Sequence, residues 1–277
     1  MSCLCIVVDC DARNWGALVE REGDYGVFYS LLSAIASFAS AHLSLSANNS
    51  VSILGVDATL NNPLLYAFDL TIQIDMTPTI VERLRMALLK SAGNSDAKCT
   101  SQFAPAFATA FCRMVSRDIN RFKKENDGAD GRILIINIGS DLAREQNALM
   151  NVFFSAHKQG IVVDVANIGE PSPVLQQACD ITMGAYINVE KPKRLLQYLM
   201  FFALGGPDSR SKFTSSVASS VDYRASCHCH GTPASIALVC SVCLSVQCKF
   251  NPICPICNTV FKIPGRGRRS RKRRHED

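Results

Sequence analysis

Two pairs of cysteines near the end of the chain have the spacing of zinc ligands. Two residues separate Cys240 from Cys243, and two separate Cys254 from Cys257. A zinc ion takes four soft or borderline donors in a tetrahedron, at about 2.0–2.3 Å, and this spacing lets one tight turn present both thiolates to one ion. Ten residues lie between the pairs, enough for a small hairpin to close back on the metal. We therefore predict a structural zinc site at these four cysteines.

A second set of candidate ligands surrounds these pairs. Cys227, Cys229 and His230 precede the first pair, and Cys248 lies between the two pairs. The ligand groups therefore alternate along the chain, as in a cross-braced two-zinc module, which favours a second zinc ion. The sequence leaves two alternatives open. His228 competes with His230 for the fourth position, and if only one zinc binds, these residues are free thiols and surface imidazoles around it. In either version protein ligands fill every position, so the metal stabilises folding and leaves no site for water or substrate.

The composition is that of a globular protein in a reducing compartment. Of 277 residues, 48% are hydrophobic and 19% are charged. We find no apolar run of the ~20 residues that span a bilayer, so we expect no membrane segment. The first residues lack the basic region and the cleavage site of a signal peptide. Without secretion the cysteines stay reduced, which favours metal binding over disulfides.

Positive charge is concentrated at the end of the chain. Residues 266–277 hold seven Lys/Arg and two acids, a net charge of +5 that equals the net charge of the whole chain. The remaining residues therefore balance, and they create no basic field that would attract nucleic acid. Residues 263–277 are predicted to form a disordered basic tail. Such a tail serves nuclear import or makes non-specific contacts to phosphate, and we favour nuclear import.

Strand and helix patterns alternate over residues 1–204. Buried β-branched runs predict strands at 3–8, 51–56, 65–74 (in two parts), 132–138, 161–166 and 181–189. Apolar stripes and end signals predict helices at 22–43, 77–93, 103–124, 145–158, from Ser172, and at 192–204. This order predicts an α/β domain, a three-layer doubly wound sandwich with a mostly parallel sheet. A Gly/Ser-rich linker at 205–220 and a cysteine-rich zinc module at 221–262 follow it.

Carboxylates follow two strands of the predicted sheet. Asp9 and Asp11 follow the first strand and Asp141 follows the fourth, so they meet at the edge where ligands bind in such sheets. Paired carboxylates are Mg²⁺ ligands, but Cys10 and Arg13 occupy positions where hydroxyl ligands would be needed. We therefore interpret the aspartates as caps of helices or turns, and we do not expect magnesium.

Motifs for catalysis are absent from the sequence. It contains neither the phosphate-binding Gly-x-x-x-x-Gly-Lys-Ser/Thr nor the nucleophile motif Gly-x-Ser-x-Gly. His42, His157 and His275 stand apart from a candidate nucleophile. Five further cysteines fall in apolar elements and are predicted core residues: Cys3, Cys5, Cys10, Cys112 and Cys179. We predict no catalytic residue and no small-molecule substrate.

The C-terminal block carries a specific resemblance. Val221-Asp222-Tyr223-Arg224-Ala225 is followed by Cys-x-Cys-His and by Val-Cys-Ser-Val-Cys-Leu-Ser-x-x-Cys-x-Phe-x-Pro-Ile-Cys-x-x-Cys. With the Asp-ended first strand and Trp15-Gly16, this order resembles the smaller von Willebrand factor A subunits of TFIIH, the general transcription and DNA-repair factor. The match spans nearly the whole chain, and its part from Asp222 to Phe261 is the most specific.

The resemblance implies a nuclear, non-catalytic core subunit of TFIIH, acting in transcription and nucleotide excision repair. In that family the von Willebrand A domain docks onto the zinc-binding region of the larger von Willebrand A subunit, and the pair positions the helicase subunits. The family's four-cysteine zinc site carries over to Cys240, Cys243, Cys254 and Cys257. The metal-ion-dependent adhesion motif Asp-x-Ser-x-Ser does not, because the sequence here is Asp-Cys-Asp-Ala-Arg at residues 9–13.

Three classes of function follow. The first is a scaffold in a multi-protein nuclear complex, which binds other TFIIH core subunits and reaches DNA only indirectly or through the tail. The second is a RING-like ubiquitin ligase component, because cross-braced zinc modules recruit ubiquitin-conjugating proteins. The third is direct nucleic-acid binding through the zinc module and the tail. We favour the first class.

Overall fold

The chain forms two compact units, Met1–Tyr223 and Arg224–Asp277. The computed structural model describes residues 2–57, 59–60, 62–68, 76–93, 103–115, 130–140, 142, 145–206, 210, 212, 221–230 and 233–261. Several predictions fall outside these ranges and concern Asp141, His275, the basic tail, most of the Gly/Ser-rich segment, and the ends of the elements predicted at 65–74 and 103–124.

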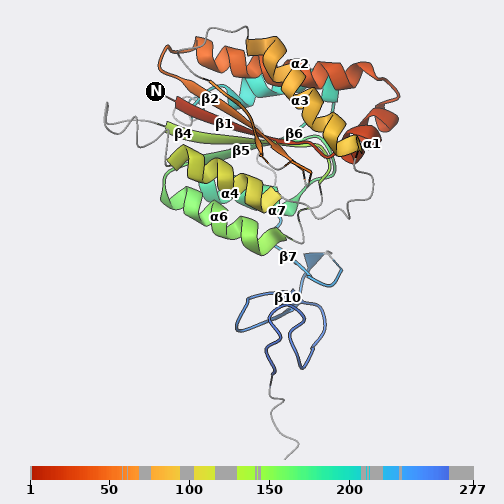
Figure 1. Ribbon diagram of the computed structural model, residues 1–277. Helices are drawn as coiled ribbons and strands as arrows, with labels where there is room; N and C mark the ends of the chain where they lie inside the picture. Colours follow the sequence, from red (N-terminus) through yellow and green to blue (C-terminus); the bar gives the residue numbers. More distant parts are fainter. Residues whose placement is uncertain are drawn as a thin grey trace, which may run out of the picture. The chain divides into compact units, whose positions relative to one another are not determined.

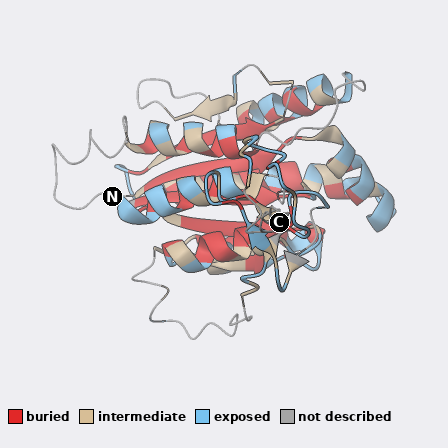
Figure 2. Cartoon of the chain, turned by 90° about the horizontal axis from the view of Figure 1, so that it is seen from below, coloured by how far each residue is buried: buried red, intermediate tan, exposed pale blue. Residues whose placement is uncertain are grey.

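A six-stranded sheet in the order β3-β2-β1-β4-β5-β6 is the centre of the first unit. The strands are β1 (Ser2–Asp9), β2 (Ser50–Val56), β3 (Leu64–Ala67), β4 (Asp130–Asn137), β5 (Val162–Asn167) and β6 (Tyr186–Asn188). All neighbours pair in parallel except β2 and β3, which are antiparallel at one edge. The continuous apolar runs of β1, β2 and β4 are those of strands covered on both faces, and these strands are buried (Figure 2).

Helices cover both faces of this sheet (Figure 1). One face carries α1 (Ala12–Glu22), α2 (Gly26–Ser44), α3 (Met76–Gly93) and a terminal run made of η3 (Pro192–Arg194), α8 (Leu195–Tyr198) and η4 (Leu199–Ala203). The other face carries α4 (Phe103–Arg113), α6 (Gln146–Lys158) and α7 (Pro173–Thr182). Alternate β1 residues supply the two cores, Leu4 and Ile6 to the first and Cys5 and Val7 to the second. The predicted three-layer α/β sandwich is confirmed.

The structure corrects three local predictions. Helix α1 was not predicted, although Asp11 caps its first turn and Gly23 ends it with φ of 65°. The strand predicted at 181–189 is confined to Tyr186–Asn188, because α7 continues to Thr182. Cys112, predicted to be a core residue, is exposed on α4.

Helix α2 is apolar enough along its 19 residues to cross a membrane by length and composition alone. Half of that stretch is buried within the unit, where Leu31, Ile35 and Phe38 contact the sheet. Its hydrophobicity is therefore that of a helix that packs against a core.

A buried cluster of charges attaches the last part of the first unit to its sheet. The carboxylate of Asp164 on β5 is fully buried and pairs with Arg132 on β4 at 3.2 Å and with Arg210 at 2.5 Å. Burial raises the pKa of Asp164, but hydrogen bonding and charge attraction from Arg210, with the charge of Arg132, outweigh burial and lower it. Further along, the carbonyl oxygen of Asp222 accepts a 2.7 Å hydrogen bond from Gln177. Residues 210 and 222 are thus both attached to the first unit.

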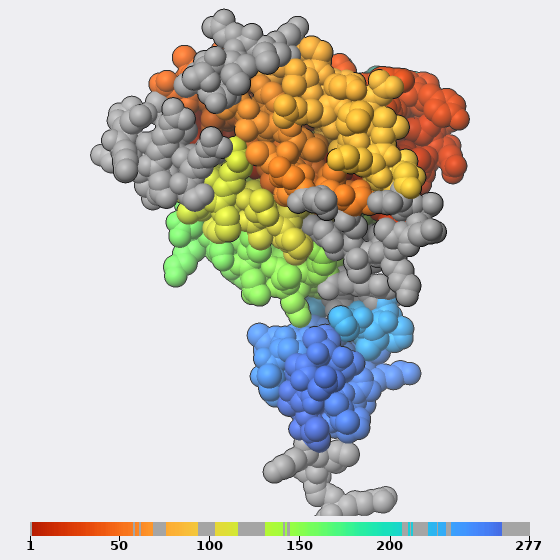
Figure 3. Space-filling model, viewed as in Figure 1, coloured from red at the N-terminus to blue at the C-terminus, as the bar shows by residue number. Residues whose placement is uncertain are grey.

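The second unit consists of short hairpins. Strands β7 (Ala225–Ser226) and β8 (Pro233–Ala234) pair, as do β9 (Leu238–Val239) and β10 (Val246–Gln247), and a single bridge joins Ile253 to Val260. In the space-filling view this unit is a small body shown in blue (Figure 3). Nine large apolar side chains between residues 236 and 260 are exposed: Ile236, Leu238, Val239, Val242, Leu244, Phe250, Ile253, Ile256 and Val260.

Candidate metal centre in the second unit

The structure brings together the four cysteines of the predicted zinc site, named here the four-cysteine set: Cys240, Cys243, Cys254 and Cys257. Their sulfur atoms all lie within 4.8 Å of one another. The Sγ atoms of Cys240 and Cys257 are 3.6 Å apart, as are those of Cys243 and Cys254. Four thiolates at about 2.3 Å from a central zinc would be about 3.8 Å apart. The spacing therefore fits a tetrahedral ion.

Two knuckles with the same backbone geometry position these sulfurs. In the first, the Leu244 amide donates to the Cys240 carbonyl at 3.0 Å, and the Cys240 amide donates to the Ser245 carbonyl at 3.0 Å. In the second, Asn258 and Thr259 make the equivalent bonds with Cys254, both at 2.9 Å. Leu244 and Asn258 share a positive φ of 57°, which closes each turn. One tight turn thus presents each cysteine pair, as the spacing predicted.

Three polar side chains that the sequence analysis missed support the sulfurs. The hydroxyl oxygens of Ser245 and Thr259 lie 3.1 and 3.0 Å from Sγ of Cys243 and Cys257, and Gln247 Nε2 donates to Cys254 at 3.5 Å. Such contacts orient metal ligands and stabilise thiolates. A sequence signal for the hydroxyls exists, because both knuckles read Cys-x-x-Cys-x-Ser/Thr.

The electrostatics of the four-cysteine set favours a bound cation. Backbone amides, first that of Cys257, lower the pKa of Cys254 to about 5 against the effect of burial. Backbone amides of Cys243 and Val242 also lower the pKa of Cys240, but burial and the neighbouring sulfurs of Cys243 and Cys257 raise it to about 11. Ionised sulfurs elsewhere in the set thus oppose ionisation of Cys240. A soft divalent cation removes this conflict, so the donor set fits zinc.

The second predicted set, named here the mixed set, is also brought together: Cys227, Cys229, His230 and Cys248. Their ligand atoms lie within 4.8 Å of one another. His230 Nδ1 is 3.4 Å from Cys248 Sγ and 3.8 Å from Cys227 Sγ. The competing His228 lies outside this cluster, and its backbone amide donates to Val246 at 2.9 Å. Of the two histidines, only His230 lies with the three cysteines of the mixed set.

The aspartates after β1 are engaged by protein donors. Asp9 is buried, and its carboxylate accepts bonds from the Asp11 amide at 3.1 Å and from Asn14 and Ser140 side chains at 2.9 Å each. Asp11 caps α1 and forms a two-point pair with Arg13 at 2.9–3.0 Å. These contacts match the predicted role in capping a helix and a turn.

Among the described residues, the remaining histidines and cysteines belong to neither of these two sets. Burial lowers the pKa of His42 to about 4, partly offset by its contact to the Ser2 carbonyl and reinforced by the charge of Arg132. Cys10 and Cys179 are buried, and burial raises the pKa of both thiols. Such thiols are poor nucleophiles.

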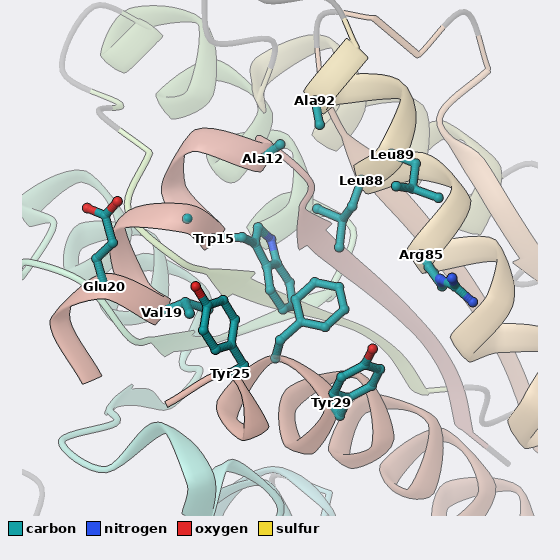
Figure 4. A pocket seen from close by; sticks show the side chains of 12 residues that line it. Ala12, Trp15, Val19, Glu20, Tyr25, Tyr29, Arg85, Leu88, Leu89 and Ala92 are labelled. Atoms are coloured by element: carbon teal, nitrogen blue, oxygen red, sulfur yellow. The ribbon is translucent and has the colours of Figure 1, made fainter. Parts of the chain in front are cut away.

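An apolar groove of about 690 Å³ lies between α1, α2 and α3 (Figure 4). Trp15 and Phe28 pack edge to face within it at 5.4 Å, and Tyr29 is 66% exposed. Glu20 and Arg85 lie at opposite sides of the groove (Figure 4). Its lining is mostly aromatic and aliphatic, with few polar side chains.

Comparisons with known proteins agree with both units. The profile of the family described as "Transcription factor Tfb4" matches residues 1–258, so the match runs through the first unit and to the end of the four-cysteine set. The chain is 29% identical over 276 residues to the general transcription and DNA repair factor IIH subunit tfb4 of Schizosaccharomyces pombe, covering 95% of this chain and 89% of that protein. It is 38% identical over 165 residues to general transcription factor IIH subunit 3 of Dictyostelium discoideum, covering 59% of this chain and 43% of that protein.

Among solved structures, the chain resembles the TFIIH p34 N-terminal domain. The TM-score is 0.55 at 28% identity, over 72% of this chain and 96% of that one. The first unit thus has the von Willebrand factor A-like fold that the sequence resemblance implied, with a sheet of parallel strands between two helical layers. The chain belongs to the Tfb4 family of transcription factors.

Proposed function

We propose that this protein is a non-catalytic structural subunit of the TFIIH core complex in the nucleus. In this role it supports transcription initiation by RNA polymerase II and nucleotide excision repair, by docking the larger von Willebrand A/zinc subunit and helping to position the helicases. The observation that carries the proposal is the family match through residues 1–258, which includes both the α/β unit and the four-cysteine set.

The metal in this proposal is a structural zinc ion in the four-cysteine set. All four ligands come from the protein, and the supporting groups Ser245, Gln247 and Thr259 hold the sulfurs in place. A closed site of this kind contributes folding free energy and offers no position for substrate. When bound, the ion would neutralise the thiolates and close the two knuckles on each other.

Within the second unit, the low charge of residues 224–261 favours a protein partner over nucleic acid. Residues 224–261 contain two Lys/Arg and no acidic residue, while nine large apolar side chains in this range are exposed. Binding to nucleic acid depends on neutralising several phosphates with Lys or Arg. Exposed apolar side chains gathered on a small unit are instead typical of an interface with protein.

On the first unit, the proposed contact for the larger subunit is the groove between α1, α2 and α3. Its apolar floor suits an aromatic or aliphatic anchor, and Glu20 and Arg85 on opposite sides suit a segment with a basic residue at one end and an acidic residue at the other. We expect an interface of standard size, about 1,600 Å² in total.

A pull-down from nuclear extract tests this function. The tagged full chain is expected to retain TFIIH subunits, and recovery of none of them would refute the proposal. Tyr29→Glu places a charge in the groove and is expected to weaken retention of the larger subunit at least tenfold. The matched control is Phe154→Glu, a substitution at a 55% exposed aromatic on α6, which covers the opposite face of the sheet. Equal retention by both variants would exclude the groove as the contact.

A further inference from the structure

The interleaving of the two ligand sets makes them unequal. All four ligands of the four-cysteine set lie within residues 240–257, so this set can close without any other part of the chain. The mixed set takes three ligands from residues 227–230 and a single one from Cys248, which lies inside the loop between the two knuckles. One set is therefore self-contained, and the other depends on a residue that the first one positions.

The β9–β10 hairpin carries this dependence. Leu238–Val239 of β9 directly precede Cys240, and Val246–Gln247 of β10 directly precede Cys248. Val239 pairs with Val246, and the first knuckle closes between them. The His228 amide also bonds the Val246 carbonyl at 2.9 Å, so the segment with the other three mixed ligands docks on the same strand. Cys248 and its partners therefore meet only when this hairpin is in place.

The two sets also differ in exposure. Cys229, His230 and Cys248 are exposed and only Cys227 is buried, whereas Cys240 and Cys254 are buried and the other two cysteines of that set are half-buried. A chelator reaches exposed ligands directly. Exchange of an ion from the four-cysteine set instead requires the knuckles to open.

We propose that the second unit binds two zinc ions in a fixed order. The ion in the four-cysteine set binds first and exchanges slowly, and the ion in the mixed set binds second and exchanges faster. The mixed-set ion links residues 227–230, and with them β7, to the rest of the unit, because its fourth ligand is Cys248. This inference rests on the zinc binding proposed above for the four-cysteine set.

Zinc counting on full-length, reduced protein tests the order. Wild type is expected to hold two zinc ions per chain, His230→Ala and Cys248→Ser one, and Cys240→Ser none. His228→Ala is the matched control for the histidine and Cys112→Ser for the cysteines, and both should keep two. Retention of two ions by His230→Ala, or of one by Cys240→Ser, would overturn the inference.

Release from wild type gives a readout that needs no variant. A metal-sensitive dye in the presence of chelator is expected to report half of the zinc in a phase at least tenfold faster than the rest. Amide exchange at residues 225–234 should rise with the fast phase, while residues 240–257 stay protected until the slow phase. Release in a single phase would contradict the proposed order.

These outcomes separate the two proposals. If wild type holds a single ion that is lost in Cys240→Ser but kept in His230→Ala, the mixed-set ion is refuted. The structural zinc of the proposed function then remains. Zero zinc in folded wild-type protein refutes both.

Discussion

The two units of this protein keep their shape with different interiors. In the first, two apolar clusters fill the space between sheet and helices. In the second, the buried residues among those that the structure describes are Cys227, Cys240, Ser245, Gln247 and Cys254. A segment of about 40 residues cannot bury enough apolar surface to fold alone, and metals commonly replace the missing core. Large apolar side chains can therefore lie on the surface of a small unit whose centre is made of cysteine sulfurs and polar side chains.

Removal of zinc is the largest expected perturbation, and it should affect only one side of this comparison. Structural zinc contributes about 10–16 kcal/mol of apparent binding free energy, which a metal-dependent fold loses on chelation. We expect amide protection of residues 224–261 to collapse. The fluorescence of Trp15, the only tryptophan, should show an unchanged unfolding midpoint for the first unit. A lower midpoint at Trp15 after chelation would show that the first unit also depends on zinc.

A cavity in the apolar core is the reciprocal test. Phe153 on α6 is fully buried and packs edge to face on Phe107 at 5.0 Å. Phe153→Ala should lower the free energy of unfolding by about 3–5 kcal/mol, through lost transfer energy and an unfilled cavity. Urea unfolding followed by Trp15 measures this, and the zinc content should not change. The adjacent Phe154 is 55% exposed, so Phe154→Ala is the control and should cost far less.

Acid is expected to weaken the first unit through His42. Burial lowers the pKa of His42 to about 4 in the folded state, whereas the unfolded chain binds the proton near pH 6.5. The contribution of the neutral imidazole is therefore complete above about pH 6.5 and is lost as the pH falls towards 4, by about 3 kcal/mol. Urea unfolding of wild type and His42→Gln between pH 7.5 and pH 4.5 checks this. The variant should have the flatter profile, and equal slopes would contradict the assignment.

The smallest effect is expected at the exposed ion pair between Lys193 and Asp24, whose charged atoms lie 2.5 Å apart. Both side chains are about half exposed, and pairs of this kind contribute little because water and salt screen them. Lys193→Ala should leave the thermal midpoint of both units unchanged within error. A clear shift in scanning calorimetry would mean that this surface does more for the first unit than its exposure suggests.

Much of the fold was predictable because its signals are local and repeated. The apolar run at residues 3–8 identified β1, and the alternation of strands and helices gave the layers. Helix α1 was missed because its buried face has only Trp15 and Leu18, with polar residues around them. Ile181 and Thr182 were assigned to a strand because β-branched residues favour strands, but packing of α7 on the sheet overrides that preference.

The candidate metal centre was predictable to the level of residue types and spacing. Two residues between cysteines imply a knuckle, and both knuckles are present. The choice between His228 and His230 was not predictable, because it depends on the hydrogen bond between the His228 amide and Val246, a residue 18 positions away. The sulfur contacts of Ser245 and Thr259 depend likewise on turn geometry that spacing alone does not describe.

The contacts of Arg210 and Asp222 affect how the chain passes from one unit to the next. Arg210 reaches the buried Asp164, Asp222 bonds Gln177, and the Tyr223 hydroxyl bonds Asp180, all on the first unit. Arg210, Asp222 and Tyr223 therefore all belong to the first unit, and a fragment that ends at residue 206 would leave the buried Asp164 without its ion pair to Arg210. A fragment meant to contain the whole first unit should therefore extend to Tyr223.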